Sequence, residues 1–446
     1  MQTSLNHESP SFHFFGVIIF IIASLFFLYE FFLRVFVGTL AHQIIPDLHL
    51  SPQHFALIGS AYYLAYGLMQ VPVGILVDRF GVKKIMVFAS LTCASSVFLF
   101  AFSTNLFFAL LSRLLMGFGS SFAFICLLIL VSSWFQRRYF AFLAGLSQFV
   151  GTMGPFLAGG PLVHLLLKSH LHWRSMLNQV GVFGLILTLC ILVFVKNKPR
   201  DVNKIVILKR KIPLSLLIRQ LLTNTQAWTI AFYSATVYVS IALLGAFWGT
   251  AYLESRGFMQ VYAASIISAA WFGYALGCIV LSLISDITLK RKPYLILSAA
   301  IGLIATLWII YVPLHSKTLY GLIFFSLGVA ASGQNVAFAT IAEHVGISIK
   351  ATALGLNNAL ITLFNAFVPL MVGVIVSLSA SKHHRIDLLT HDYIQGLIIM
   401  PIMYFMALII SCFFIQETFC KLKKENIVLN TDYHPVKPVV RYDEAS

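Results

Sequence analysis

The chain has 446 residues, of which 59% are hydrophobic and only 10% are charged. A soluble domain carries about 25% charged residues, so this composition excludes an ordinary water-soluble protein and indicates an integral membrane protein. The formal net charge of +15 would suit a nucleic-acid-binding protein, but Lys and Arg fall between apolar runs and not in one stripe with interleaved aromatics. We therefore expect a lipid bilayer around the chain and no nucleic acid as a partner. The six scattered cysteines predict neither a disulfide framework nor a metal site, and we expect no cofactor.

Apolar runs of about 20 residues are read as membrane-spanning helices, because the hydrocarbon core is about 30 Å thick. The sequence contains twelve such runs, at 14–38, 55–77, 84–103, 106–131, 139–166, 175–195, 226–252, 262–286, 293–313, 318–341, 351–378 and 393–415. We predict an all-α membrane protein with an N-terminal six-helix half (1–195), a cytoplasmic linker (196–225), a C-terminal six-helix half (226–415) and a disordered cytoplasmic tail (416–446).

The basic residues predict the orientation of the chain, since cytoplasmic segments are enriched in Lys and Arg. With the N-terminus in the cytoplasm, cytoplasmic segments hold 22 of the 30 Lys and Arg residues and outer segments hold six. We expect both termini in the cytoplasm and the protein in a bacterial inner membrane.

The loop after the second run reads GILVDRFGVKK. Glycine at its start permits a close helix approach, the later glycine permits a tight turn, and the acid with its basic neighbours is able to form an interfacial charge network. We expect a conformational latch made of Gly74, Asp78, Arg79, Gly81, Lys83 and Lys84. This loop resembles the one between helices 2 and 3 of the major facilitator superfamily.

Three further stretches carry the same resemblance across the chain. A degenerate copy of the loop follows the eighth run, where Asp286 is kept but the immediate Asp-Arg pair is missing, so we expect a weaker latch there. RLLMGFGSSFAF and WFQRRYFAFLAG are similar to the helix 4 pattern and the helix 4–5 loop of the superfamily. The chain looks closest to bacterial nutrient transporters related to organic-anion symporters and to the lysosomal dipeptide transporter branch. The resemblance implies a fold of two six-helix halves and uptake of organic acids, amino acids or short peptides.

Charged residues inside spans are candidates for function, because a central charge costs roughly 2.5–3.5 kcal/mol on insertion. Glu30 and Arg34 lie one helical turn apart on one face of the first run. Protonation of Glu30 would free Arg34 for an anionic ligand, so we predict proton coupling by Glu30 and substrate binding by Arg34. Alternatively, Arg34 extends to the outer surface. Arg113 is predicted either to take part in coupling or to be a structural hydrogen-bonded charge.

Uncharged polar and aromatic residues recur inside the spans, and amides there should face a cavity or another helix. As further substrate-binding candidates we predict Tyr62, Tyr66, Gln70, Gln148, Tyr233, Trp271, Tyr274, Gln334, Asn335, Asn357 and Asn358. For any one of them, a simple helix–helix contact is an equally good interpretation. A cationic group surrounded by Tyr, Gln and Asn suits a carboxylate or a zwitterion.

The leading hypothesis is a monomeric secondary active transporter that moves a small anionic or zwitterionic organic solute by alternating access, coupled to protons. The first alternative is a proton-coupled exporter of drugs or metabolites; GTMGPFLAGG (151–160) is similar to an antiporter signature, although its spacing favours a close helix crossing. A membrane sensor without transport is the second. We expect no enzymatic activity, because the sequence contains no HExxH, P-loop or GxSxG motif.

Overall fold

The computed structural model describes residues 14–135, 140–169, 171–196, 223–312, 316–345, 350–382 and 388–420, and most of these residues are helical. Most of the predicted linker and tail lies outside the described residues. The helices of the first part are α1 (Phe14–Thr39), α2 (Ala41–Asp47), α3 (Pro52–Phe80), α4 (Val82–Ala101), α5 (Leu106–Ser120), α6 (Ala123–Trp134), α7 (Phe140–Ala158), α8 (Gly160–Ser169) and α9 (Trp173–Phe194).

The second part contains α-helices and two π-helical turns, η2 and η4. In chain order they are α11 (Thr225–Ala242), η2 (Leu243–Trp248), α12 (Gly249–Ser255), α13 (Gln260–Ile287), α14 (Lys292–Tyr311), α15 (Lys317–Ala331), α16 (Gly333–His344), α17 (Lys350–Lys382), α18 (Thr390–Leu397), α19 (Ile399–Ile409) and η4 (Ile410–Phe414). Several helices begin at a side chain that accepts a hydrogen bond from a first-turn amide, as Asn105 and Asn224 do.

The predicted all-α membrane fold is confirmed. Among the described residues, ten helical segments are long and apolar enough to span a membrane, and α7 with α8, bent by 43°, can form an eleventh. The remaining predicted span, 55–77, falls within α3, which is 29 residues long and packs between α17 and α5. The twelve apolar runs therefore correspond to twelve helical passes, several of them broken into two segments.

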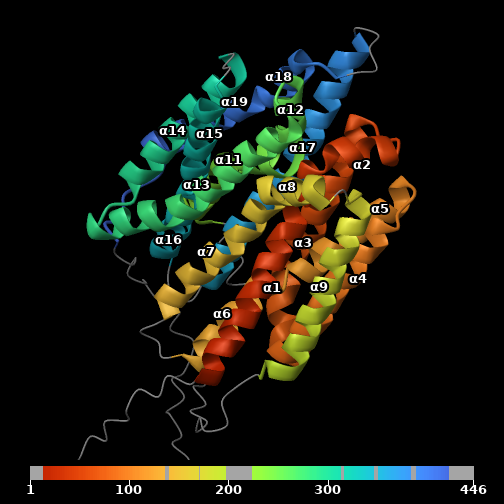
Figure 1. Ribbon diagram of the computed structural model, residues 1–446. Helices are drawn as coiled ribbons and strands as arrows, with labels where there is room; N and C mark the ends of the chain where they lie inside the picture. Colours follow the sequence, from red (N-terminus) through yellow and green to blue (C-terminus); the bar gives the residue numbers. More distant parts are fainter. Residues whose placement is uncertain are drawn as a thin grey trace, which may run out of the picture.

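The helices of the first and second parts form two groups that meet along a central interface (Figure 1). Within the first group α1 packs on α7, and α4 on α9; within the second, α13 packs on α15, and α11 on α17. Across the interface α3 lies against α17, α7 against α13, and α1 against η2. The assignment of these groups to residues 1–195 and 226–415 as two domains stays a prediction.

The two ends of the bundle differ. We call the end at which α1 begins the inner end, since the charge distribution predicts that it faces the cytoplasm. At the opposite, outer end the interface is packed tightly: Gly38 of α1 lies directly against the backbone of Ala246 and Phe247 in η2, and Gly59 of α3 lies against the Phe247 ring. The structure is therefore closed at the outer end.

Glycines also bring α7 against α1. A Cβ atom at Gly154 would collide with the Leu28 carbonyl oxygen, and one at Gly151 would lie 2.5 Å from the Phe27 ring. The stretch that is similar to an antiporter signature thus forms a close helix crossing, which is the interpretation that its spacing favours.

Candidate functional site

A buried ion pair lies on the interface side of α1. Nη2 of Arg34 is 3.1 Å from Oε2 of Glu30, and the Tyr62 hydroxyl of α3 donates a hydrogen bond of 2.8 Å to the same oxygen. Glu30 is fully buried, whereas the Arg34 side chain keeps 9% of its surface exposed. The i, i+4 spacing brings the two charges together within one helix, and the third partner comes from the tertiary fold.

Aromatic rings surround the guanidinium of Arg34. Its Cζ lies 4.1 Å from the ring centroid of Phe31 and 4.7 Å from that of Tyr66, distances at which a cation is attracted to the ring face. Nε of Arg34 has no hydrogen-bond partner among the described residues. Because the residue is buried, it does not extend to the outer surface.

Arg113 of α5 is tied to the backbone of two other helices. Its guanidinium donates to the carbonyl oxygens of Leu33, Arg34 and Ile58 over 2.5, 3.3 and 3.3 Å. These carbonyls satisfy a fully buried cation and hold α1 against α5 next to the ion pair. The geometry favours the structural alternative for Arg113, and its predicted part in proton coupling stays untested.

Residues of the second group of helices face the ion pair with uncharged side chains. Tyr238 of α11 lies close enough to Arg34 to interact with it electrostatically, and its ring packs edge-on against Tyr274 of α13 at 5.6 Å. The Tyr274 hydroxyl donates to Oε1 of Gln334 over 3.1 Å. Trp271 packs against Tyr274, and its Nε1 is buried without a hydrogen-bond partner among the described residues. We call Tyr238, Trp271, Tyr274 and Gln334 the neutral wall.

The remaining substrate-binding candidates lie in different places: some are at the interface between the two groups of helices, and one joins helices within a single group. Nδ2 of Asn358 donates to Oε1 of Gln70 over 2.6 Å and so joins α17 to α3. Asn357 is buried, and neither polar atom of its side chain has a partner among the described residues. Tyr233 is placed differently, because its hydroxyl donates to the Leu295 carbonyl and joins α11 to α14. The structure therefore does not bring Tyr233 to the ion pair.

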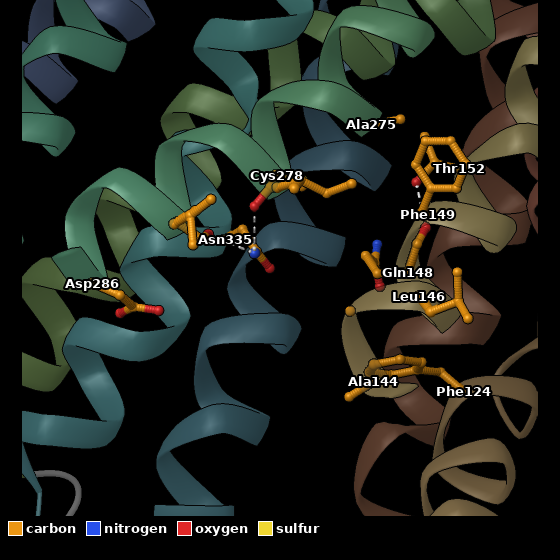
Figure 2. Close-up of a pocket in the computed structure, with 14 residues that line it drawn as sticks. Phe124, Ala144, Leu146, Gln148, Phe149, Thr152, Ala275, Cys278, Asp286 and Asn335 are labelled. Carbon is orange, nitrogen blue, oxygen red and sulfur yellow. Dashed lines mark hydrogen bonds between the residues drawn. The ribbon is translucent and has the colours of Figure 1, made fainter. Parts of the chain in front are cut away.

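A cavity of about 640 Å³ opens between α7 and α13 towards the inner end. Figure 2 shows Gln148 and Phe149 on one wall and Cys278 and Asn335 on the other. Nδ2 of Asn335 donates to Oγ of Ser282 over 3.0 Å. Cys278, on the second wall, lies next to Tyr274 of the neutral wall, one helical turn away on α13. The interface is therefore closed at the outer end and hollowed towards the inner end, which corresponds to an inward-open state if the predicted orientation holds.

The loop predicted to act as a latch has one of the two features expected of its glycines, and its role as a latch stays a prediction. The tight turn expected at Gly81 is present, since this residue ends α3 with φ +84°, which favours glycine. The close helix approach expected at Gly74 is wrong for this state, because a Cβ atom there would meet open space. Arg79 and Lys84 are exposed and Lys83 is half-buried, while the Asp78 side chain lies outside the described part.

The degenerate second copy forms a denser charge network than its sequence indicates. Arg291 donates to Oδ1 of Asp286 over 2.6 Å and to Oε1 of Glu343 over 2.7 Å, so it replaces the missing neighbouring arginine. Burial alone would lower the pKa of Arg291, but its hydrogen bonds to Glu343 and Asp286 outweigh this and raise it. The expectation of a weaker latch at Asp286 is therefore not supported. The sequence did not predict Glu343 and Glu417 as members of this network. In the sequence, each is recognisable only as an acidic residue at the inner end of a predicted span.

Glu417 joins the network through backbone amides. Its carboxylate accepts hydrogen bonds from the amides of Arg291 and Lys292, both over 2.8 Å, and from those of Thr418 and Phe419. Burial would raise the pKa of Glu417, but these four bonds outweigh burial and lower it below 4.5. The ionised form thus fixes the segment after η4 to the start of α14.

We expect Glu417→Gln to lower the free energy of unfolding by about 1–3 kcal/mol at neutral pH, because hydrogen bonds to a charged acceptor are lost. A depressed folded-state pKa stabilises above the unfolded value of about 4.5. The difference between wild type and variant should therefore shrink as the pH falls below that value. Denaturation in detergent at several pH values tests this; a difference independent of pH would contradict it.

The fold and the site together define a class: a helical membrane protein of two opposed helix groups, open at one end, with a buried acid–base pair between them. The major facilitator superfamily model matches residues 19–369. The chain belongs to the major facilitator superfamily.

Relatives within this superfamily include transporters and a sensor. The chain is 25% identical over 166 residues to a probable sulfoacetate transporter of Cupriavidus necator, which covers 37% of this chain and 38% of that protein. It is 25% identical over 333 residues to the membrane sensor protein UhpC of Salmonella typhimurium, covering 69% of this chain and 73% of that protein. The chain thus spans well under half the length of the first of these relatives.

The fold is shared with solved structures of this superfamily. A bacterial homologue of the human lysosomal transporter Spinster, in an inward-facing and unoccupied conformation, superposes with a TM-score of 0.70. The superposition covers 90% of this chain and 97% of that one, at 15% identity, so it supports the fold alone.

Proposed function

We propose that this chain is a secondary active transporter that moves a small anionic or zwitterionic organic solute by alternating access, coupled to protons. The observation that carries the proposal is the buried pair of Glu30 and Arg34, in which the carboxylate holds two partners and the guanidinium keeps an unpaired Nε. A buried charge pair facing an interface between two helix groups is costly and marks a functional position.

The coupling step follows from the contacts of Glu30. When the Glu30 carboxylate accepts a proton, its attraction for Arg34 falls and the guanidinium becomes available to a carboxylate of the solute. The charged or titratable groups around Glu30 are Arg34 on its own helix, Tyr62, Tyr63 and Tyr66 on α3, Cys93 on α4 and Tyr238 on α11. Arg113 of α5 also lies nearby, with its guanidinium 4.7 Å from the Tyr62 ring, but Arg34 is the cation that contacts the Glu30 carboxylate, so protonation of Glu30 acts on Arg34.

Reconstitution tests this proposal. Purified protein in liposomes is expected to accumulate an organic anion when the outside is made acidic, and a proton uncoupler should abolish the accumulation. Binding of the solute without flux in either direction would instead favour the sensor alternative, which the similarity to UhpC supports.

Glu30→Gln is expected to separate exchange from accumulation. The amide keeps the size of the side chain and mimics the protonated state, so Arg34 stays available to the solute. Counterflow exchange of labelled solute should persist, while accumulation driven by a pH gradient should fall at least about tenfold, which corresponds to about 1.4 kcal/mol. Unchanged accumulation in the variant would remove Glu30 from the coupling step.

A further inference from the structure

The charged side chains inside the membrane helices limit which charges of a bound solute the site can neutralise. In the described helices, the ionised side chains that lie away from helix ends are Glu30, Arg34 and Arg113. Arg113 is occupied by backbone carbonyls of α1 and α3. Arg34 is therefore the one cation that a solute can pair with, and Glu30 neutralises it while the site is empty.

The opposing surface offers no second charge for a ligand. Each member of the neutral wall is uncharged, and the Lys and Arg residues of helices α11–α19 lie at helix ends in the described part of the chain. Among the residues that line the cavity, Asp286 is the one charged side chain, and Arg291 pairs with it at the inner end.

Burial decides which member of the pair a solute reaches. Glu30 is fully buried, with Arg34 and the Tyr62 hydroxyl on its carboxylate, whereas the Arg34 side chain keeps 9% of its surface exposed. An ammonium group of a zwitterion therefore has no accessible carboxylate at the pair. A carboxylate has an accessible guanidinium.

We propose that the site selects organic monoanions that carry hydroxyl groups, takes up one proton with each, and discriminates against dianions and zwitterions. This rests on the proposed transport function. In the empty site Glu30 and Arg34 sum to zero. When Glu30 accepts one proton and Arg34 transfers its hydrogen bonds to the solute's carboxylate, the sum is again zero. A dianion would leave one uncompensated negative charge in a buried site, which is strongly unfavourable.

The neutral wall accounts for the hydroxyl groups of the solute. The buried Nε1 of Trp271 lacks an acceptor, and the hydroxyl of Tyr274 and the amide of Gln334 already form a hydrogen-bonded pair beside it. Hydroxyl groups both donate and accept, so they can satisfy such groups without adding charge. A second carboxylate at this position would be desolvated without a cation.

The test compares small organic solutes that differ in charge; gluconate and glucarate also share a carbon skeleton. Uptake driven by an acidic exterior is measured in liposomes for gluconate against glucarate, for lactate against sulfoacetate, and for serine as a zwitterion. We expect a monoanion to be taken up at least about tenfold faster than its dianionic partner and than serine. An imposed membrane potential should change monoanion uptake less than about twofold, because the loaded and empty sites carry the same charge.

Each outcome decides between the two proposals. Equal or faster uptake of the dianion or of serine, or uptake that follows the membrane potential, would overturn this inference and leave proton-coupled transport standing. If none of the five solutes moves or binds to folded protein, the proposed function fails together with the inference.

A charge variant tests the same inference from the side of the protein. Gln334→Lys adds a cation to the neutral wall and is expected to raise the ratio of glucarate uptake to gluconate uptake at least about fivefold. Asn335→Lys, in the cavity, is the second variant should the first insert poorly into the membrane.

Discussion

Uptake of the organic anion is expected to fall at least about a hundredfold when Arg34 is replaced by Gln. The guanidinium is the only accessible cation of the site among the described residues, and a charge-assisted hydrogen bond in a buried site contributes about 1.5–3 kcal/mol. Arg34→Lys keeps the charge but loses the planar fork, so it should retain part of the activity. Initial uptake rates in liposomes measure both variants.

A double variant separates the loss of binding from misfolding. Arg34→Gln alone leaves Glu30 buried without its cation, which destabilises the fold. Glu30→Gln combined with Arg34→Gln removes both charges and should regain thermal stability in detergent, yet it should remain inactive. Normal uptake by the double variant would show that the pair is structural.

The second large effect is expected at the closed outer end. A Cβ atom at Gly38 would collide with the backbone carbonyl of Ala246 in η2, and a backbone cannot move aside as a flexible side chain can. Overpacking of this kind costs about 1–3 kcal/mol. Gly38→Ala should therefore shift the equilibrium from the inward-open towards the outward-open state by about tenfold to a hundredfold.

Accessibility from outside measures this shift. Thr39 is buried beside Gly38 in the described state, so a Thr39→Cys probe should react slowly with an impermeant maleimide. With Gly38→Ala it should react much faster, and transport should fall at least about tenfold. Gly321→Ala is the matched control, because a Cβ atom there meets open space. A protected probe and normal transport in Gly38→Ala would contradict the inference that the contact of Gly38 with η2 closes the outer end.

Local patterns in the sequence predicted the parts of this molecule that depend on hydropathy and helical spacing. Twelve apolar runs became twelve helical passes, and the four-residue spacing of Glu30 and Arg34 became an ion pair. The turn at Gly81 followed from the conformational freedom of glycine. Each of these features is set by neighbours within a few residues along the chain.

Contacts between distant segments were not predictable in this way. The hydrogen bond of Asn358 to Gln70 joins residues 288 positions apart, and Arg291 meets Glu343 across 52 positions. Whether another helix approaches Gly74 is a matter of tertiary packing, and in this structure a Cβ atom there would meet open space. The carbonyl ligands of Arg113 belong to the backbone of other helices, so no sequence motif encodes them.

Proton movement that accompanies the solute tests the central claim most directly. Liposomes that contain the protein and a pH-sensitive dye, without an initial pH gradient, should acidify inside when gluconate or another transported organic anion is added outside. Glu30→Gln should exchange the same solute without acidification, and Arg34→Gln should do neither. Entry of the solute into wild-type liposomes with no change of internal pH would contradict proton coupling through the Glu30–Arg34 pair.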